Sequence, residues 1–148
     1  MINVGIIGYG KMGQIRHQVI SDMNDVNLVS IYDPININSD LINVDTAEQI
    51  IDNADIDTIF ICTPNYLNKE LTIKSLQAKK NVFCEKPPAF TKKDVMDIRK
   101  IEKESGKVLM YGFNHRHHGS IKHMKKLIDG KTFGSILWMR GRYGKSVD

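Results

Sequence analysis

Three glycines near the N-terminus are spaced for binding a pyrophosphate. The apolar segment 2–7 runs directly into a Gly-x-Gly-x-x-Gly pattern made by Gly8, Gly10 and Gly13, and a helical pattern follows. Glycine carries no Cβ, so the backbone N–H groups of such a turn can approach a pyrophosphate at the N-terminus of the helix. The pattern predicts a dinucleotide site, and the alternative is a tight turn that binds no ligand.

An acidic residue stands where a dinucleotide site needs an acceptor for the adenosine ribose. Asp33 follows the apolar run 28–32 and lies about 20 residues after Gly13, the spacing typical of such sites. Its carboxylate would repel a 2′-phosphate, and no Arg or Lys occurs at 33–40, so the pattern favours NAD over NADP. The alternative is an acid that only stabilises the turn before Pro34.

The elements that must position these residues alternate between strand-like and helix-like patterns. Because parallel strands need crossover connections, this alternation predicts an α/β fold, a Rossmann-like doubly wound parallel sheet. Strands are expected at 2–7, 27–32, 57–62, 81–84 and 107–111, helices at 12–23, 46–51, 69–79 and 91–105, a polar loop at 35–41 and a short segment at 42–44.

Several helix ends carry recognisable signals. Asp45 or Thr46 is expected to cap the second helix, with Glu48 completing a capping box. Thr91 opens the fourth helix and Gly106 ends it.

The unusual loops of the chain all follow predicted strands. Ligands of doubly wound sheets bind beyond the carboxyl ends of the strands, so we expect one site there. The loops are the glycine turn, Asp33 and residues 62–65, 85–88 and 114–117.

The last thirty residues differ in pattern from the rest. A helix is expected at 120–128, ending near Gly130, and a strand at 135–143. We interpret residues 1–118 as a dinucleotide-binding domain. Residues 119–148 are interpreted as the first helix and strand of an incomplete α+β second domain.

The order of these motifs resembles the Gfo/Idh/MocA oxidoreductases, which include inositol dehydrogenases and many sugar and nucleotide-sugar dehydrogenases. The most specific element is Glu85-Lys86-Pro87 after an apolar strand. The resemblance covers essentially the whole chain. It implies an NAD-dependent oxidoreductase that removes a hydride from a hydroxyl-bearing carbon of a sugar, polyol or nucleotide sugar.

The resemblance also implies roles for matching residues. Lys86 would be catalytic, because an ammonium beside the reacting carbon can stabilise a developing alkoxide and relay protons. The Lys86–Pro87 bond is expected to be cis, whereas Asn68, where relatives often carry His, is assigned no role. The implied cofactor-binding residues are Gly8, Tyr9, Gly10, Lys11, Met12, Gly13, Asp33, Cys62, Thr63, Pro64, Asn65, Glu85, Lys86, Asn114 and Arg116.

One departure from the family pattern affects the expected activity. Relatives carry a proton-transfer His in an Asp-x-Gly-x-His segment of the second domain, and these 148 residues contain no such segment. We therefore expect the cofactor half of a cytoplasmic dehydrogenase, inactive alone and homo-oligomeric at full length. The alternative is a non-catalytic NAD-binding module.

Composition argues against other classes. The apolar runs are shorter than the ~20 residues that span a membrane, and the N-terminus lacks a basic signal-peptide segment. Cys62 and Cys84 lie in apolar strand-like runs, which favours buried reduced thiols. The net charge of +4 reflects a basic cluster within 122–145 that has no interleaved aromatic platform, so no nucleic-acid partner is expected. A nucleic-acid-binding redox sensor would also need a winged helix, which we do not find.

A metal site at 115–118 is the sharpest rival interpretation. Three histidines surround Arg116, but no carboxylate or thiol stands beside them in the sequence. A loop bordering the cofactor explains them better, and no metal is expected.

Overall fold

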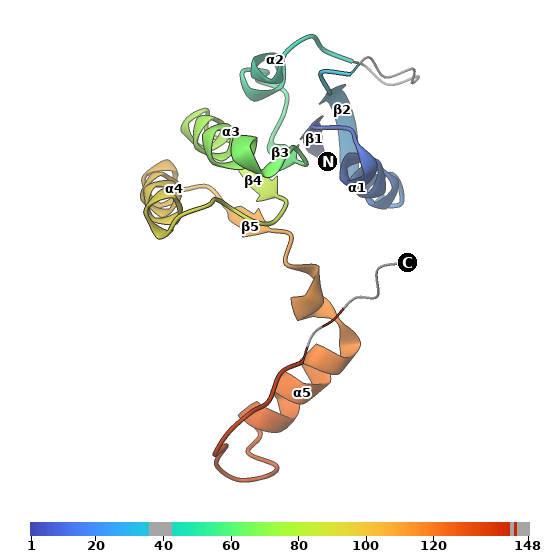
Figure 1. The fold of residues 1–148 in the computed structure, drawn as a ribbon. Helices are drawn as coiled ribbons and strands as arrows, with labels where there is room; N and C mark the ends of the chain where they lie inside the picture. The colour runs from blue at the N-terminus through green and yellow to red at the C-terminus, as the bar shows by residue number, and fades with distance from the viewer. Residues whose placement is uncertain (36–42, 143, 145–148) are drawn as a thin grey trace. The chain divides into compact units, whose positions relative to one another are not determined.

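The computed structural model describes residues 1–35, 43–142 and 144 (Figure 1). The chain divides into two compact units, residues 1–112 and residues from 113 onward. The predicted domain boundary after residue 118 stays a prediction. The predicted loop 35–41 and segment 42–44 lie largely outside the described residues, although Asn43 forms an isolated parallel bridge with Ile31.

The first unit is built on a parallel five-stranded sheet, which confirms the predicted α/β, Rossmann-like fold (Figure 1). The strand order is β2-β1-β3-β4-β5, and each pair of neighbours is parallel. The strands are β1 (Ile2–Ile7), β2 (Val26–Tyr32), β3 (Thr58–Ile61), β4 (Asn81–Cys84) and β5 (Leu109–Tyr111).

Helices cover both faces of this sheet (Figure 1). The crossovers contain α1 (Lys11–Ser21), α2 (Ala47–Ile51), α3 (Asn65–Gln77) and α4 (Lys92–Ser105). Successive strand residues point to opposite faces, so Ile6 packs with Ile20 of α1 whereas Ile7 packs with the core that includes α2, α3 and α4. Strands buried on both faces explain the continuous apolar runs in the sequence.

Helix ends follow the sequence signals with one correction. Thr91 accepts the N–H of Asp94, and Gly106 ends α4 in the left-handed conformation at φ 69°. Thr46 caps α2, and its capping box is completed by Gln49, so the prediction for Glu48 was wrong. With Thr46 as the cap, the third helical position falls on residue 49.

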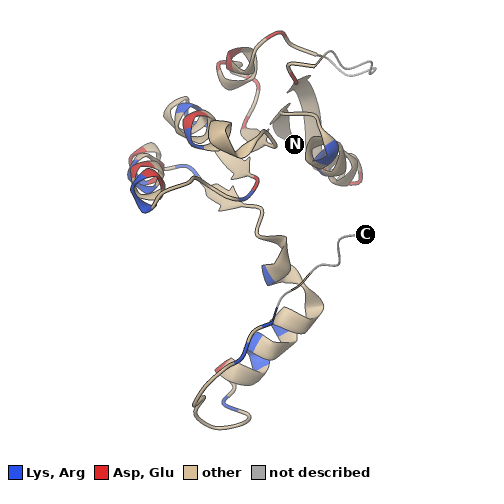
Figure 2. Cartoon of the chain, in the orientation of Figure 1, with Lys and Arg blue, Asp and Glu red and all other residues tan. Residues whose placement is uncertain are grey.

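The second unit consists of a short 3-10 helix, η1 (Asn114–His117), and α5 (Gly119–Asp129). Lysines lie along α5 and are exposed (Figure 2). Residues 135–142 form no strand, so the prediction of a strand at 135–143 was wrong over the described part of that range. A strand is stabilised by a paired neighbour, and no described strand pairs with this segment.

None of the described helices combines the length and apolarity needed to cross a bilayer.

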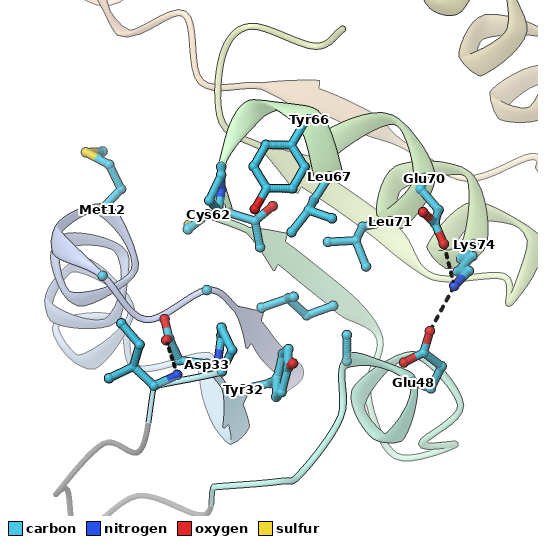
Figure 3. A pocket seen from close by; sticks show the side chains of 18 of the residues that line it. Met12, Tyr32, Asp33, Glu48, Cys62, Tyr66, Leu67, Glu70, Leu71 and Lys74 are labelled. Atoms are coloured by element: carbon cyan, nitrogen blue, oxygen red, sulfur yellow. Dashed lines mark hydrogen bonds and ion pairs between the residues drawn. The ribbon is translucent and has the colours of Figure 1, made fainter.

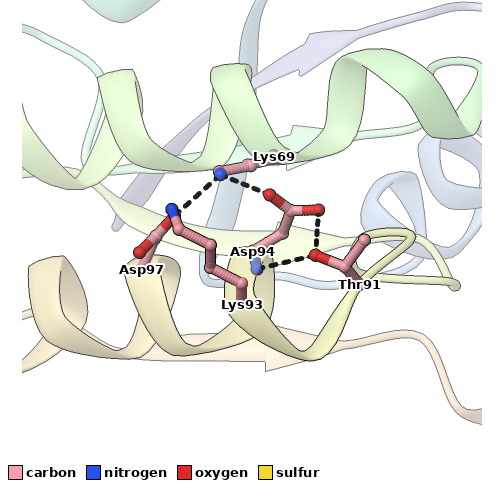
Figure 4. A network of polar contacts seen from close by, with 5 residues as sticks. All are labelled: Lys69, Thr91, Lys93, Asp94 and Asp97. Carbon is pink, nitrogen blue, oxygen red and sulfur yellow. Dashed lines mark hydrogen bonds and ion pairs between the residues drawn. The ribbon is translucent and has the colours of Figure 1, made fainter.

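An ionic network joins α3 to α4 on the surface of the first unit (Figure 4). Lys69 Nζ lies 2.5 Å from Asp94 Oδ1 and 2.9 Å from Asp97 Oδ2. Hydrogen bonding to Lys69 lowers the pKa of both carboxyl groups, and the two carboxylates raise the pKa of Lys69. Thr91 Oγ1 donates to Asp94 Oδ2, so the network also holds the start of α4.

Replacing Lys69 with Met is expected to lower the Tm at neutral pH, because two carboxylates lose their shared cation. A carboxyl pKa that folding lowers contributes stability above its ordinary value, and this contribution is lost as pH falls through the lowered value. The Tm difference from wild type should therefore shrink in acid, as measured by circular dichroism. Lys93→Met is the control, because Lys93 is highly exposed and its ion pair with Asp97 is longer, at 3.3 Å. A pH-independent difference for Lys69→Met would contradict the account.

Candidate functional site

The first glycine of the turn after β1 permits a close contact between two backbones. Gly8 has φ +90°, and its N–H donates to Tyr32 O at 2.7 Å. A Cβ at this position would lie 2.7 Å from the carbonyl carbon and oxygen of Cys62. Such contacts are closer than packed carbon atoms tolerate, so this position requires glycine for both conformation and space.

The other two glycines have different surroundings. A Cβ on Gly13 would lie 2.2 Å from Gly8 O, so helix α1 can pack on the turn only without that atom. Around the corresponding point on Gly10, no described heavy atom lies within 4 Å. Gly10 is the N-cap of α1, so the space beside it adjoins the helix N-terminus, where an anion is favoured.

Asp33 joins the glycine turn to the end of β2. Its Oδ2 accepts the N–H of Tyr9 at 2.6 Å, and its Oδ1 accepts the N–H of Ile35 at 3.0 Å. The carboxylate is therefore fixed beside the turn. A carboxylate offers about four acceptor positions, so two remain for hydroxyl groups of a ligand.

A cleft of about 610 Å³ opens between the glycine turn, the end of β2 and helix α3 (Figure 3). Eight of the predicted cofactor-binding residues line it, and these are Gly8, Gly10, Lys11, Met12, Asp33, Cys62, Thr63 and Pro64. Of the other predicted residues, Tyr9 and Gly13 belong to the turn itself and Asn65 is the first residue of α3. Their individual roles stay predictions.

The wall opposite the glycine turn was not identified from the sequence. Tyr66, Leu67 and Leu71 of α3 face the cleft, and Lys74 forms ion pairs there with Glu48 and Glu70, each at 2.8 Å (Figure 3). The pKa of Lys74 is raised, mainly by its hydrogen bond to Glu48 and next by its hydrogen bond to Glu70. The four-residue spacing of Glu70 and Lys74 is typical of ion pairs on one face of a helix, so this pair could have been predicted from the sequence.

The predicted residues at the end of β4 form a second cluster. Glu85 is buried, with 6% of its surface exposed, and its Oε1 accepts hydrogen bonds from Arg16 Nε at 2.9 Å and Nη2 at 2.5 Å. Lys86 is exposed, and the Lys86–Pro87 bond is cis as predicted. Arg16 had no motif around it that would have identified it.

Asn68, to which the sequence assigned no role, holds this loop. Its side chain is fully buried, and Nδ2 donates to Glu85 O at 3.1 Å and to Pro87 O at 2.9 Å. Its Oδ1 accepts from Thr63 Oγ1 at 3.2 Å. One amide thus connects the loop after β3 with the loop after β4.

Asn114 and Arg116 belong to the second unit, where they lie on η1. Their participation in a cofactor site stays a prediction.

Cys84 is a core residue, whereas Cys62 is partly exposed and lines the cleft. Both are free thiols, and burial raises the pKa of Cys62 and of Cys84 to about 12. A thiol with so high a pKa is a poor nucleophile at neutral pH. Within the described ranges, no three His, Cys, Asp or Glu side chains gather in a way that could hold a metal ion.

Comparison with known proteins identifies a family match. The model of GFO_IDH_MocA, described as "Oxidoreductase family, NAD-binding Rossmann fold", matches residues 2–113. The 2,7-anhydro-N-acetylneuraminate hydratase of Escherichia coli (strain K12) is 34% identical over 142 residues, which are 93% of this chain and 38% of that protein. The myo-inositol 2-dehydrogenase of Thermotoga maritima is 28% identical over 141 residues, covering 90% of this chain and 42% of that protein.

Solved structures agree with the sequence relatives. The myo-inositol 2-dehydrogenase from Lactobacillus plantarum superposes with a TM-score of 0.81 at 28% identity, covering 90% of this chain and 43% of that chain. An oxidoreductase from Bacillus cereus shares the fold, with a TM-score of 0.83 at 23% identity over 93% of this chain and 42% of that one. The chain thus spans about two fifths of the length of these relatives.

Two alanine substitutions should separate the roles of the glycines. Gly13→Ala is expected to lower the free energy of unfolding by about 2 kcal/mol or more, because the added methyl overlaps Gly8 O. Gly10→Ala should cost less than about 1 kcal/mol, because its methyl enters open space at a helix cap. Urea unfolding measures both, and equal losses would contradict the packing described for the turn.

Proposed function

We propose, because this chain belongs to the Gfo/Idh/MocA oxidoreductase family and contains its NAD-binding Rossmann domain, that its cleft binds NAD(H) for hydride transfer at a hydroxyl of a sugar, polyol or nucleotide sugar. The observation that carries the proposal is the convergence of the glycine turn, Asp33 and residues 62–64 around one cleft. Relatives named as inositol and levoglucosan dehydrogenases support the class of substrate.

The surroundings of the turn fit a dinucleotide. The open space beside Gly10 would admit the pyrophosphate to the first N–H groups of α1, which carry the positive end of the helix dipole. Asp33 would accept hydrogen bonds from the adenosine ribose. The apolar side chains of α3 that face the cleft would contact the adenine, and Tyr66 offers an exposed ring there.

Lys86 is the residue of this chain proposed to act on the substrate. Bound NAD supplies the hydride acceptor, so the protein has to orient the substrate and manage its proton. The Lys86 ammonium would stabilise negative charge that develops on the substrate oxygen as its hydroxyl proton leaves. Its exposed position at the carboxyl end of β4 supports this role.

Selectivity for NAD over NADP follows from the charges of the cleft. Asp33, Glu48 and Glu70 line it, and Lys74 is already paired with both glutamates. Lys11 also lines the cleft, but it is the first residue of α1 and lies at the glycine turn. On the far wall, a 2′-phosphate would meet carboxylates and, among the described residues, no unpaired lysine. This arrangement favours NAD.

A second candidate reaction is hydration of an anhydro-sugar acid. Two relatives, 34% and 29% identical, are named 2,7-anhydro-N-acetylneuraminate hydratase. A hydratase adds water and produces no net NADH, whereas a dehydrogenase converts NAD⁺ to NADH. Parallel measurement of NADH absorbance and of product therefore distinguishes the two reactions.

Assayed alone, these 148 residues are proposed to bind the dinucleotide without sustained turnover. They contain no Asp-x-Gly-x-His segment, which leaves Lys86 without the proton-transfer histidine implied by the family resemblance. The expected homo-oligomer and cytoplasmic location stay predictions.

Isothermal titration is expected to show that the chain binds NADH at least about tenfold more tightly than NADPH, a difference of about 1.4 kcal/mol. Asp33→Asn should weaken NADH binding by about tenfold, because a charge-assisted hydrogen bond contributes about 1.5 kcal/mol or more, and should narrow the preference for NADH. Asp22→Asn, at the opposite end of α1, is the control and should change neither value. Absence of saturable binding of either dinucleotide would refute the proposed function.

Incubation of the 148-residue chain with NAD⁺ and a panel of sugars, inositols and 2,7-anhydro-N-acetylneuraminate should give no sustained formation of NADH or hydrated product. Chromatography of the mixture checks for product that absorbance misses. Robust turnover by these residues alone would overturn the proposal that they bind without catalysis.

A further inference from the structure

The main chain on both sides of Lys86 is held by a single buried side chain. The two amide hydrogens of Asn68 go to Glu85 O and Pro87 O, the carbonyls that flank Lys86 in the chain. Both donors of the amide are thus used on one loop, and its oxygen is used on Thr63. Movement of the loop would break both hydrogen bonds and leave the buried amide of Asn68 without its two acceptors, which is costly.

The side chain that precedes Lys86 is held from the other direction. The Arg16 guanidinium donates twice to Glu85 Oε1 and lies 4.7 Å above the ring of Phe83. The carboxylate also lies against Gly112, where a Cβ would be 2.8 Å from Oε2. Arg16 belongs to the helix that begins at the glycine turn, so the pair connects that helix to the end of β4.

Stability alone is a weak reason for this ion pair. The Arg16 and Glu85 side chains are 16% and 8% exposed, and a pair so deeply buried loses much of its attraction to desolvation. Apolar residues of similar volume would often stabilise a fold equally well. What such a pair adds is a fixed position for both charged groups.

We propose that Arg16 and Asn68 are positioning residues that together fix Lys86 at the nicotinamide end of the cofactor, an inference that rests on the proposed function. Lys86 is exposed between restrained neighbours. Because its long flexible stem does not itself fix the ammonium, the position of the main chain sets the region that the ammonium can reach. Arg16 fixes the residue before it, and Asn68 fixes the peptide groups on both sides.

The test compares NADH with ADP-ribose, which lacks only the nicotinamide. Asn68→Asp removes both donors at constant volume. The double variant Arg16→Met, Glu85→Gln removes the ion pair without leaving a buried charge. Glu85→Gln alone keeps an acceptor for Arg16 and measures any direct contribution of the carboxylate to NADH binding. Lys80→Met is the matched control, because Lys80 is also buried and donates to two carbonyls, Asn53 O and Ile56 O, at the opposite edge of the sheet.

Asn68→Asp and the double variant are expected to bind ADP-ribose within about threefold of wild type. The factor by which NADH binds more tightly than ADP-ribose should fall at least about tenfold, or about 1.4 kcal/mol. Lys80→Met should keep that factor within about threefold of wild type. The factor should fall further in the double variant than in Glu85→Gln alone, and equal losses in these two variants would contradict the role of Arg16. The backbone N–H of residue 85 donates to Ile61 O at 2.9 Å, so its hydrogen exchange should accelerate in Asn68→Asp and in the double variant and not in Lys80→Met. If Asn68→Asp does not fold, the double variant alone decides the outcome.

Three results would overturn the positioning role: equal loss of both ligands, an unchanged factor in Asn68→Asp and in the double variant, or a wild type that binds NADH no more tightly than ADP-ribose. A wild type that binds neither ligand would instead refute the proposed function. In that case, unchanged exchange of the backbone N–H of residue 85 in the double variant would separately refute the restraint of this loop.

Discussion

The close backbone contact between the turn after β1 and the loop after β3 is the constraint on which the cleft depends. Gly8 adopts φ +90° and leaves no room for a Cβ against Cys62. The parallel pairing of Ile7 with Ile61 brings both loops to the same edge of the sheet. Because the two backbones touch, the helix N-terminus of α1 and the start of α3 face a common space, and the walls of the cleft follow from that contact.

Polar side chains then fix the loops at this edge, whereas apolar side chains build the body of the sheet. Asp33 joins the glycine turn to β2, Asn68 joins the loops after β3 and β4, and Arg16 joins α1 to Glu85. Each joins segments that are distant in sequence. Hydrophobic packing tolerates changes in side-chain shape, whereas the hydrogen bonds of a buried polar group are satisfied in only a few geometries. The site is therefore preorganised by a small number of directional contacts.

Local signals in the sequence predicted most of the fold and the near side of the site. The apolar runs predicted all five strands, Thr91 and Gly106 predicted the ends of α4, and the glycine spacing located the turn. The capping box was displaced by one residue because Asp45 and Thr46 are both favoured cap types, and the structure uses Thr46. The strand expected at 135–143 depended on a pairing partner that a sequence pattern does not report. Arg16 and Asn68 were missed because their partners lie 69 and up to 19 residues away, so no local spacing reveals them.

The central claim is that the cleft of the first unit binds NAD(H) through the glycine turn, Asp33 and residues 62–64. Amide chemical shifts of the isotope-labelled chain, followed during addition of NADH, test this claim most directly because they report the location of binding. The account predicts that the largest shifts occur at residues 8–13, 33–35 and 62–66 and saturate together. Shifts that cluster elsewhere, or that leave the glycine turn unchanged at saturation, would contradict it.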